Sequence, residues 1–144
     1  MSLENLSRIG QLESHEANEA QISRLLESSI RTLEDARVES ITSETRLEAG
    51  YRAIMQLCML ALWANGYRPT SAAGHHMVMI QSLVHTVGLD SDQVRLLDTF
   101  RVKRNTINYT GDDVDIASVE ACIFAGENLL KHVRTWLGEQ RPDL

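Results

Sequence analysis

The chain has 144 residues, of which 43% are hydrophobic and 24% charged, and its formal net charge is −6. This length and balance are typical of one globular domain with a sizeable core, which excludes a disordered chain or a miniprotein held by disulfides. The acidic balance argues against a broad nucleic-acid-binding surface, because such surfaces bind by neutralising phosphates. A local basic patch remains compatible with this balance.

The first residues lack a basic segment followed by an apolar one, so no secretory signal is expected. The most apolar stretch, residues 53–64, contains Gln56 and is shorter than the about 20 residues of a membrane-spanning helix. Cys58 and Cys122 lie far apart within apolar helical patterns and are interpreted as reduced core thiols. We therefore expect a cytoplasmic protein with no membrane partner.

In chain order, residues 1–15 are weakly patterned and are expected to form an N-terminal arm or a short helix. Apolar residues then recur at three- and four-residue spacing over about residues 16–38, which predicts an amphipathic helix. Thr42 offers an N-cap for a second helix, which should end at Asn65-Gly66, where glycine can adopt a left-handed conformation. The predicted buried residues of this helix are Leu47, Tyr51, Ile54, Cys58, Ala61 and Leu62.

A third, shorter helix is predicted between Gly74 and Gly88. Asp90, with Gln93 three residues later, resembles a capping box that opens a fourth helix, and Thr110-Gly111 ends it. The last helix is expected over about residues 114–137, and no alternating β segment is predicted. The expected inward residues of the third and last helices are Met77, Ile80, Val84 and Val87, then Ile116, Val119, Ile123, Leu130, Val133 and Leu137.

Long helices joined by short connections favour antiparallel neighbours. The fold is therefore predicted to be all-α, an up-and-down bundle of four or five helices over residues 16–138, with a C-terminal tail over residues 139–144. The sequence has no glycine-rich phosphate loop, no paired cysteine motif and no HExxH. None of its five histidines follows a glutamate at the Glu-x-x-His spacing of di-iron bundles. We expect no metal and no cofactor.

One stretch of the fourth predicted helix combines cationic, amide and phenol side chains. Arg101, Arg104 and Asn108 are spaced three and four residues apart and share one helical face. Asn105 and Tyr109 form a second pair, adjacent around the helix. The stretch therefore places a polar, cationic face close to the predicted end of the helix.

Arg104 can bind a phosphate or a carboxylate through two parallel hydrogen bonds, and neighbouring asparagines can orient it. Lys103 adds a further charge to the same stretch. The plainer interpretation is an ion pair between Arg104 and a carboxylate such as Glu48 or Glu120, with the asparagines as hydrogen-bonding residues at the helix end. Both interpretations follow from the residues alone.

Two histidines open the third predicted helix, where exposed N–H groups and the helix dipole favour an anion. His75 and His76 are therefore candidates for a nucleotide site, although polar capping of the loop also explains them. Tyr51 shares a stripe with apolar neighbours and is interpreted as structural, with a hydroxyl that can reach the face of Arg104. His15 lies in the weakly patterned N-terminal segment and is expected to be solvated.

An arginine followed by asparagine, with a histidine or tyrosine a few positions later, resembles the signature of the HEPN family of helical bundles. Here these residues are Arg104, Asn105 and Tyr109. The helix that ends in Gly66-Tyr67-Arg68-Pro69 and the Gly74-His75-His76 opening of the next helix are also similar to HEPN domains. The resemblance covers most of the chain.

The resemblance implies a homodimer in which the motif helices of two subunits meet. Many HEPN proteins are metal-independent endoribonucleases of toxin–antitoxin or other defence systems, in which arginine and histidine from both subunits converge on the scissile phosphate. This implies RNA or a nucleotide as ligand and an antitoxin-like protein as partner. The catalytic candidates are then Arg104, Asn105 and Tyr109, and the candidate substrate-binding residues are Arg101, Lys103, Asn108, His75 and His76.

Tyr109 is a departure from the family pattern, because it stands where the histidine is expected. A histidine titrates near neutrality and can transfer a proton, whereas a tyrosine ordinarily titrates near pH 10. Acid–base help of this kind is worth about 10²–10⁴-fold in rate. On a regular helix Arg104 and Tyr109 lie about 140° apart, so they converge only if the helix ends there or a second subunit supplies one of them.

The sequence therefore favours an RNA- or phosphate-binding cleft over efficient cleavage. The alternative is a non-catalytic helical protein–protein interaction module, in which Arg104 is buried against an acidic side chain and no cleft exists.

Overall fold

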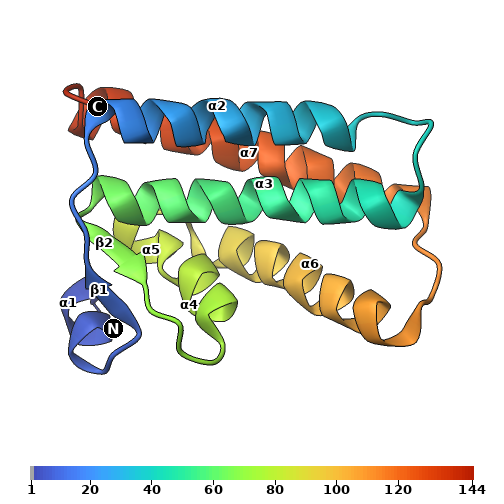
Figure 1. Cartoon of the computed structure of the whole chain (residues 1–144), viewed down its shortest axis with the longest axis horizontal. Helices are drawn as coiled ribbons and strands as arrows, with labels where there is room; N and C mark the ends of the chain where they lie inside the picture. The colour runs from blue at the N-terminus through green and yellow to red at the C-terminus, as the bar shows by residue number, and fades with distance from the viewer. Residues whose placement is uncertain (1) are drawn as a thin grey trace.

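The computed structural model describes residues 2–144, which are mostly helical, so the all-α prediction is confirmed. The long helices alternate in direction along the chain, with α3 between the others (Figure 1). The elements are α1 (Leu3–Arg8), β1 (Leu12–Ser14), α2 (Glu19–Ala36), α3 (Ser43–Ala64), β2 (Tyr67–Pro69), α4 (His75–Gln81), α5 (Leu83–Thr86), α6 (Ser91–Thr110) and α7 (Ile116–Gln140).

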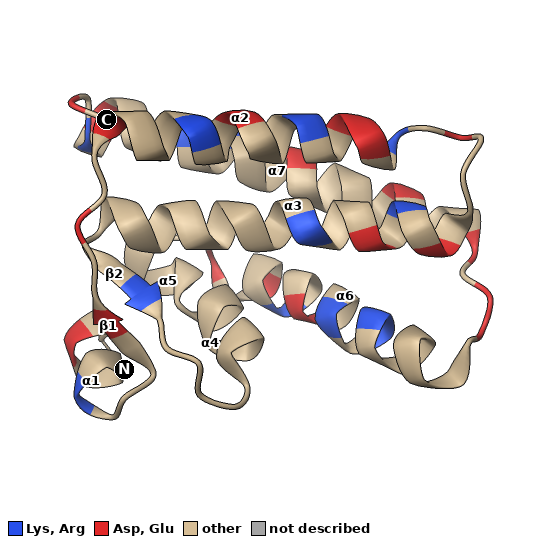
Figure 2. Cartoon of the chain, in the orientation of Figure 1, with Lys and Arg blue, Asp and Glu red and all other residues tan. Residues whose placement is uncertain are grey.

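Helix α3 is the centre of the bundle, because it contacts α2, α7, α4 and α6. Its residues from Ala53 to Ala64 carry no charge, and Figure 2 shows this half of the helix without acidic or basic bands. Burial on several faces explains this composition, since an apolar helix is stable only where neighbours cover it. All six residues predicted to be buried on this helix are buried.

Local signals place the helix ends. The Thr42 hydroxyl accepts a hydrogen bond from the backbone N–H of Thr45, as the predicted N-cap of α3. Asp90 accepts from the backbone N–H of Gln93 at 2.8 Å at the start of α6. Gly111, with φ of 70°, ends α6 in the left-handed conformation, and its N–H donates to a carbonyl of the last turn.

The structure adds one short pair of strands that the sequence analysis did not predict. Strands β1 and β2 pair antiparallel, with Leu12 opposite Pro69, and so attach the N-terminal segment to the bundle. Three-residue strands are too short to show an alternating pattern. The expectation of a solvated His15 is wrong, because its ring packs 5.1 Å from that of Trp63 and its backbone N–H donates to Gly66.

The predicted third helix is divided at Ser82 into α4 and α5, and the Ser82 hydroxyl donates to a carbonyl of the preceding turn at 2.7 Å. Met77 and Val84 of the predicted stripe are exposed, whereas its other two members are buried. In α7, Ile116 is exposed because it lies in the first turn, ahead of the packed part of the helix.

Both cysteines are free and buried, as predicted, and burial raises the pKa of the Cys122 thiol to about 12. Across residues 2–144, we find no helix long and apolar enough to cross a membrane.

Candidate functional site

Arg104 of α6 and Glu48 of α3 form a bidentate ion pair. Arg104 donates from Nε to Oε2 at 3.0 Å and from Nη2 to Oε1 at 2.9 Å. The side chains are 28% and 47% exposed, so the pair lies at the surface of the junction between the two helices. Figure 2 shows acidic and basic bands on these stretches of α3 and α6. Glu48 is therefore one of the two carboxylates named in the sequence analysis as possible ion-pair partners of Arg104.

Tyr51 lies one turn after Glu48 on α3 and supports the Arg104 guanidinium. The Cζ atom of Arg104 is 5.5 Å from the centroid of the Tyr51 ring, a cation–π distance. The Tyr51 side chain is almost fully buried, and this burial raises its pKa, with partial opposition from Arg104. The phenol therefore stays protonated at neutral pH.

His76, near the start of α4, completes the arrangement. Its Nδ1 atom and the Tyr51 hydroxyl are hydrogen bonded at 3.0 Å. Burial, the neighbouring His75 and Arg104 together lower the pKa of His76 below its ordinary value of 6.5. A neutral imidazole with one nitrogen bonded to Tyr51 has its other nitrogen available for proton transfer. The structure thus places His75, His76 and Arg104 in the lining of one groove, with Tyr51 between His76 and Arg104.

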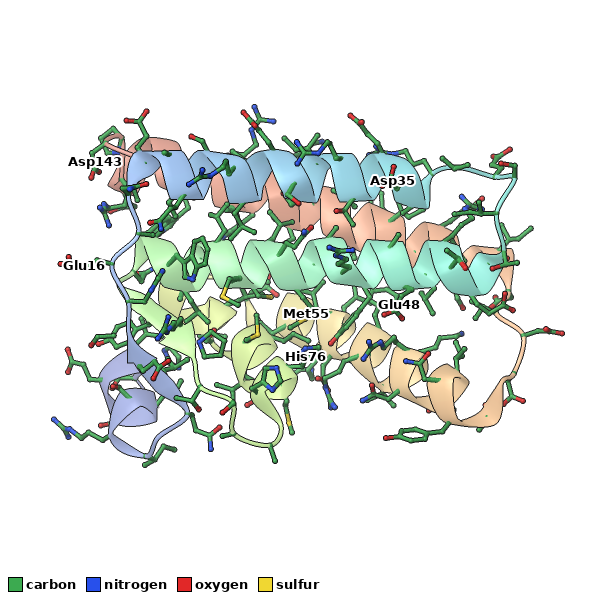
Figure 3. The ribbon with its side chains drawn as sticks, viewed as in Figure 1. Glu16, Asp35, Glu48, Met55, His76 and Asp143 are labelled. Atoms are coloured by element: carbon green, nitrogen blue, oxygen red, sulfur yellow. The ribbon has the colours of Figure 1, made fainter. Side chains whose placement is uncertain are left out.

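These residues stand at one end of an open groove of about 710 Å³. Helix α3 forms its floor, α2 contributes one wall, and α4 with the loop after β2 contributes the other. Figure 3 shows Met55 and His76 where α3 faces α4, and Glu48 further along α3, where it faces α6. Away from the charged end the groove is apolar, with a lining of Leu25, Met55, Met59, Trp63, Pro69 and Met79.

Arg52 is a residue of this site that the sequence did not single out. It is exposed and lines the groove, and no ion pair among residues 2–144 includes it. Glu48, four residues earlier on α3, would be its natural partner on an isolated helix. Because Glu48 instead binds Arg104, the Arg52 guanidinium does not pair with Glu48 and can bind another group. The four-residue spacing of Glu48 and Arg52 is the feature of the sequence that could have identified Arg52.

The other two cations of the motif stretch are engaged within the protein. Arg101 donates to Asp98 on the preceding turn, from Nε to Oδ1 at 2.6 Å. Lys103 donates to Ser118 and lies 3.4 Å from Asp115, both near the start of α7. Their charges are therefore compensated, and neither lines the groove.

The polar residues after Arg104 are not gathered at the groove. The Asn105 side chain accepts from Arg104 Nη1 at 3.5 Å, and Asn108 lines a separate depression on the other side of the Arg104–Glu48 pair. Tyr109 is 92% exposed. Because α6 continues as a helix to Thr110, one chain does not bring Tyr109 to Arg104.

The site thus combines guanidinium groups and a neutral imidazole at the end of an apolar groove. Over residues 2–144, no group of three or more histidine, cysteine, aspartate or glutamate side chains could hold a metal ion. Anion binding and proton transfer are the chemistry that this arrangement supports. No family model and no curated protein matches this chain.

Proposed function

We propose that this chain is a HEPN-like RNA-binding protein that cleaves RNA without a metal at the groove beside Arg104. One observation carries the proposal: Arg104, Tyr51 and His76, from three different helices, are in successive contact at the end of one groove. His76 supplies the histidine that the motif stretch of α6 lacks. In line with the resemblance, the protein would act as a homodimer in a defence system with an antitoxin-like partner.

The phosphate would lie between Arg52 and Arg104. Glu48 engages the Nε and Nη2 atoms of Arg104, which leaves Nη1 with only the long contact to Asn105. Two guanidinium groups and one carboxylate leave a net charge of +1 at this end of the groove. A charge-assisted hydrogen bond from each guanidinium would hold the phosphate and stabilise the negative charge that develops on it.

His76 would accept the proton of the RNA 2′-hydroxyl. When its Nδ1–H donates to the Tyr51 oxygen, Nε2 keeps the lone pair that this step requires. The 2′-oxygen then bonds to phosphorus, the bond from phosphorus to the 5′-oxygen breaks, and the leaving oxygen gains a proton from solvent. The products are a 2′,3′-cyclic phosphate and a 5′-hydroxyl.

A cleavage assay on total RNA in excess chelator tests this function. We expect cleavage by the wild type and a loss of about 10²-fold or more in His76→Ala and in Arg104→Ala. Matched controls are His85→Ala and Arg95→Ala, which remove an exposed histidine and an exposed arginine outside the groove. Wild-type protein that neither binds nor cleaves RNA would refute the proposal.

The bidentate pair of Arg104 with Glu48 favours a second candidate, the non-catalytic interaction module. In that case the pair is structural and Glu48→Gln lowers stability with no effect on RNA. In the RNA-binding case, Glu48→Gln removes a repelling carboxylate and strengthens RNA binding. Unfolding and RNA-binding measurements on the same variant therefore separate the two candidates.

A further inference from the structure

Beyond its charged end the groove is lined by three methionines, of which Met55 and Met79 are largely buried. Met55 and Met59 lie one turn apart on α3, and Met79 of α4 stands on the opposite wall. Methionine side chains are unbranched and polarizable, so they adapt to a flat apolar ligand and contact aromatic rings favourably. The charged end and this part of the groove share the same floor, so one ligand can reach both.

Two polar atoms of groove-lining residues have no hydrogen-bond partner. They are Oε1 of Gln56 and Nε1 of Trp63, and both are shielded from solvent in the free protein. The other amide atom of Gln56 already donates to Ser28 at 3.0 Å. Unpaired buried groups are unfavourable, and this pair consists of one acceptor and one donor. A ligand whose edge carries both kinds of group would pair with them.

The residues that carry these atoms follow Arg52 along α3. Gln56 follows Arg52 by four residues, which is about 6 Å along α3. Trp63 is two turns further, and long helical side chains lean toward the helix N-terminus, so its indole covers the turn nearer Gln56. A ligand with a phosphate at Arg52 therefore places its next chemical group beside Met55 and Gln56.

We propose that this part of the groove binds a nucleobase of the RNA whose phosphate lies between Arg52 and Arg104. The inference rests on the proposed function and names the part of the ligand that the apolar groove recognises. A nucleobase has two apolar faces, which fit between the methionines, and a polar edge, which meets Gln56 and Trp63. An acyl chain would fill the same space but would leave both polar atoms unpaired. Both polar atoms are buried in the free protein, so binding of the base requires the side chains that cover them to move.

Competition binding of four ribonucleoside monophosphates and ribose 5-phosphate against labelled RNA tests the inference. We expect at least one nucleotide to bind about tenfold or more tightly than ribose 5-phosphate, because only the nucleotide fills the base subsite. Gln56→Leu should remove most of this difference without weakening ribose 5-phosphate. The change removes the unpaired Oε1 together with the hydrogen bond from Nε2 to Ser28, so circular dichroism checks that the variant folds. Gln81→Leu, at an exposed position of α4, is its control.

The outcomes distinguish this inference from the function on which it rests. Equal affinity for nucleotides and ribose 5-phosphate, with both weakened by Arg52→Ala, would overturn the base subsite and leave the phosphate site standing. Competition by decanoate as strong as that by the nucleotides would also overturn it, because the groove would then accept any apolar anion. No binding of RNA or of any phosphate would refute the proposed function itself.

Discussion

Arg104 on α6 and Glu48 on α3 are 56 positions apart in the chain, and two parallel N–H···O hydrogen bonds join them at 2.9 and 3.0 Å. The pair holds the guanidinium over the Tyr51 ring and at the rim of the groove. It therefore sets the orientation of Arg104 and the local charge at the same time.

Glu48→Gln should lower the free energy of unfolding by no more than about 1 kcal/mol, because the ion pair is partly exposed and screened by solvent. The same change should strengthen RNA binding by removing a negative charge. Chemical denaturation and RNA titration measure the two effects, with Glu34→Gln at an exposed site of α2 as the control. Weaker RNA binding would show that Glu48 serves mainly to orient Arg104.

Tyr51→Phe keeps the ring beneath Arg104 and removes the hydroxyl that bonds His76. We expect a loss of about 0.5–1.5 kcal/mol in stability and a lower kcat with little change in KM, because the imidazole loses its orientation. Tyr67→Phe serves as the control, since no hydrogen bond involving the Tyr67 hydroxyl is found among the described side chains. Equal kinetics of Tyr51→Phe and wild type would contradict a role for this hydrogen bond.

The free energy of unfolding should decrease as the pH falls, because His76 binds a proton more readily in the unfolded chain. Its pKa in the folded protein lies below the ordinary value of 6.5, so the unfolded chain binds more protons between the two values. The contribution of His76 is therefore fully present above about pH 6.5 and is lost as the pH falls toward the folded-state pKa. Urea denaturation from pH 8 to pH 5 should show a shallower loss for His76→Gln than for wild type. Parallel curves would disprove this assignment.

Tyr109→His tests whether a second subunit completes the site. The side chain is 92% exposed, so the change should leave the free energy of unfolding within about 0.5 kcal/mol. Within one chain residue 109 does not reach Arg104, and we expect cleavage at the wild-type rate. A gain in cleavage that rises with protein concentration would instead show that position 109 of one subunit acts at Arg104 of another.

Two glycines of α7 should respond oppositely to alanine. A Cβ atom at Gly126 would lie 2.9 Å from the buried Leu33 side chain, so Gly126→Ala should cost about 1–3 kcal/mol. At Gly138 the same atom meets open space, and Gly138→Ala should add roughly 0.5–1 kcal/mol through helix propensity. Thermal or chemical unfolding of both variants checks this, and a stabilised Gly126→Ala would show that α2 and α7 pack more loosely than described.

Local features of the sequence were sufficient to predict the long helices and several of their ends. Thr42 and Gly111 act within three or four residues of themselves, so their roles as caps do not depend on the rest of the fold. The three- and four-residue spacing of apolar residues likewise identified the buried face of α3, because that periodicity is a property of the helix itself. Glu48 was one of two partners foreseen for Arg104.

The division of the third predicted helix, the pairing of β1 with β2 and the contact of His15 with Trp63 had no such local signal. Each results from packing between segments that are far apart in the chain or from a break too short to alter the sequence pattern. Periodicity over a few turns carries no information about these long-range contacts.

For the candidate site, too, some features were predictable from the sequence and others depended on the tertiary structure. The sequence by itself determined that Arg104 lies on a helix with polar neighbours, and that His75 and His76 open another helix, because both statements concern spacing along the chain. Only the tertiary structure decided that His76, rather than Tyr109, lies with Arg104. The packing of α4 and α6 against α3 places Tyr51 between them, and the regular continuation of α6 turns Tyr109 away.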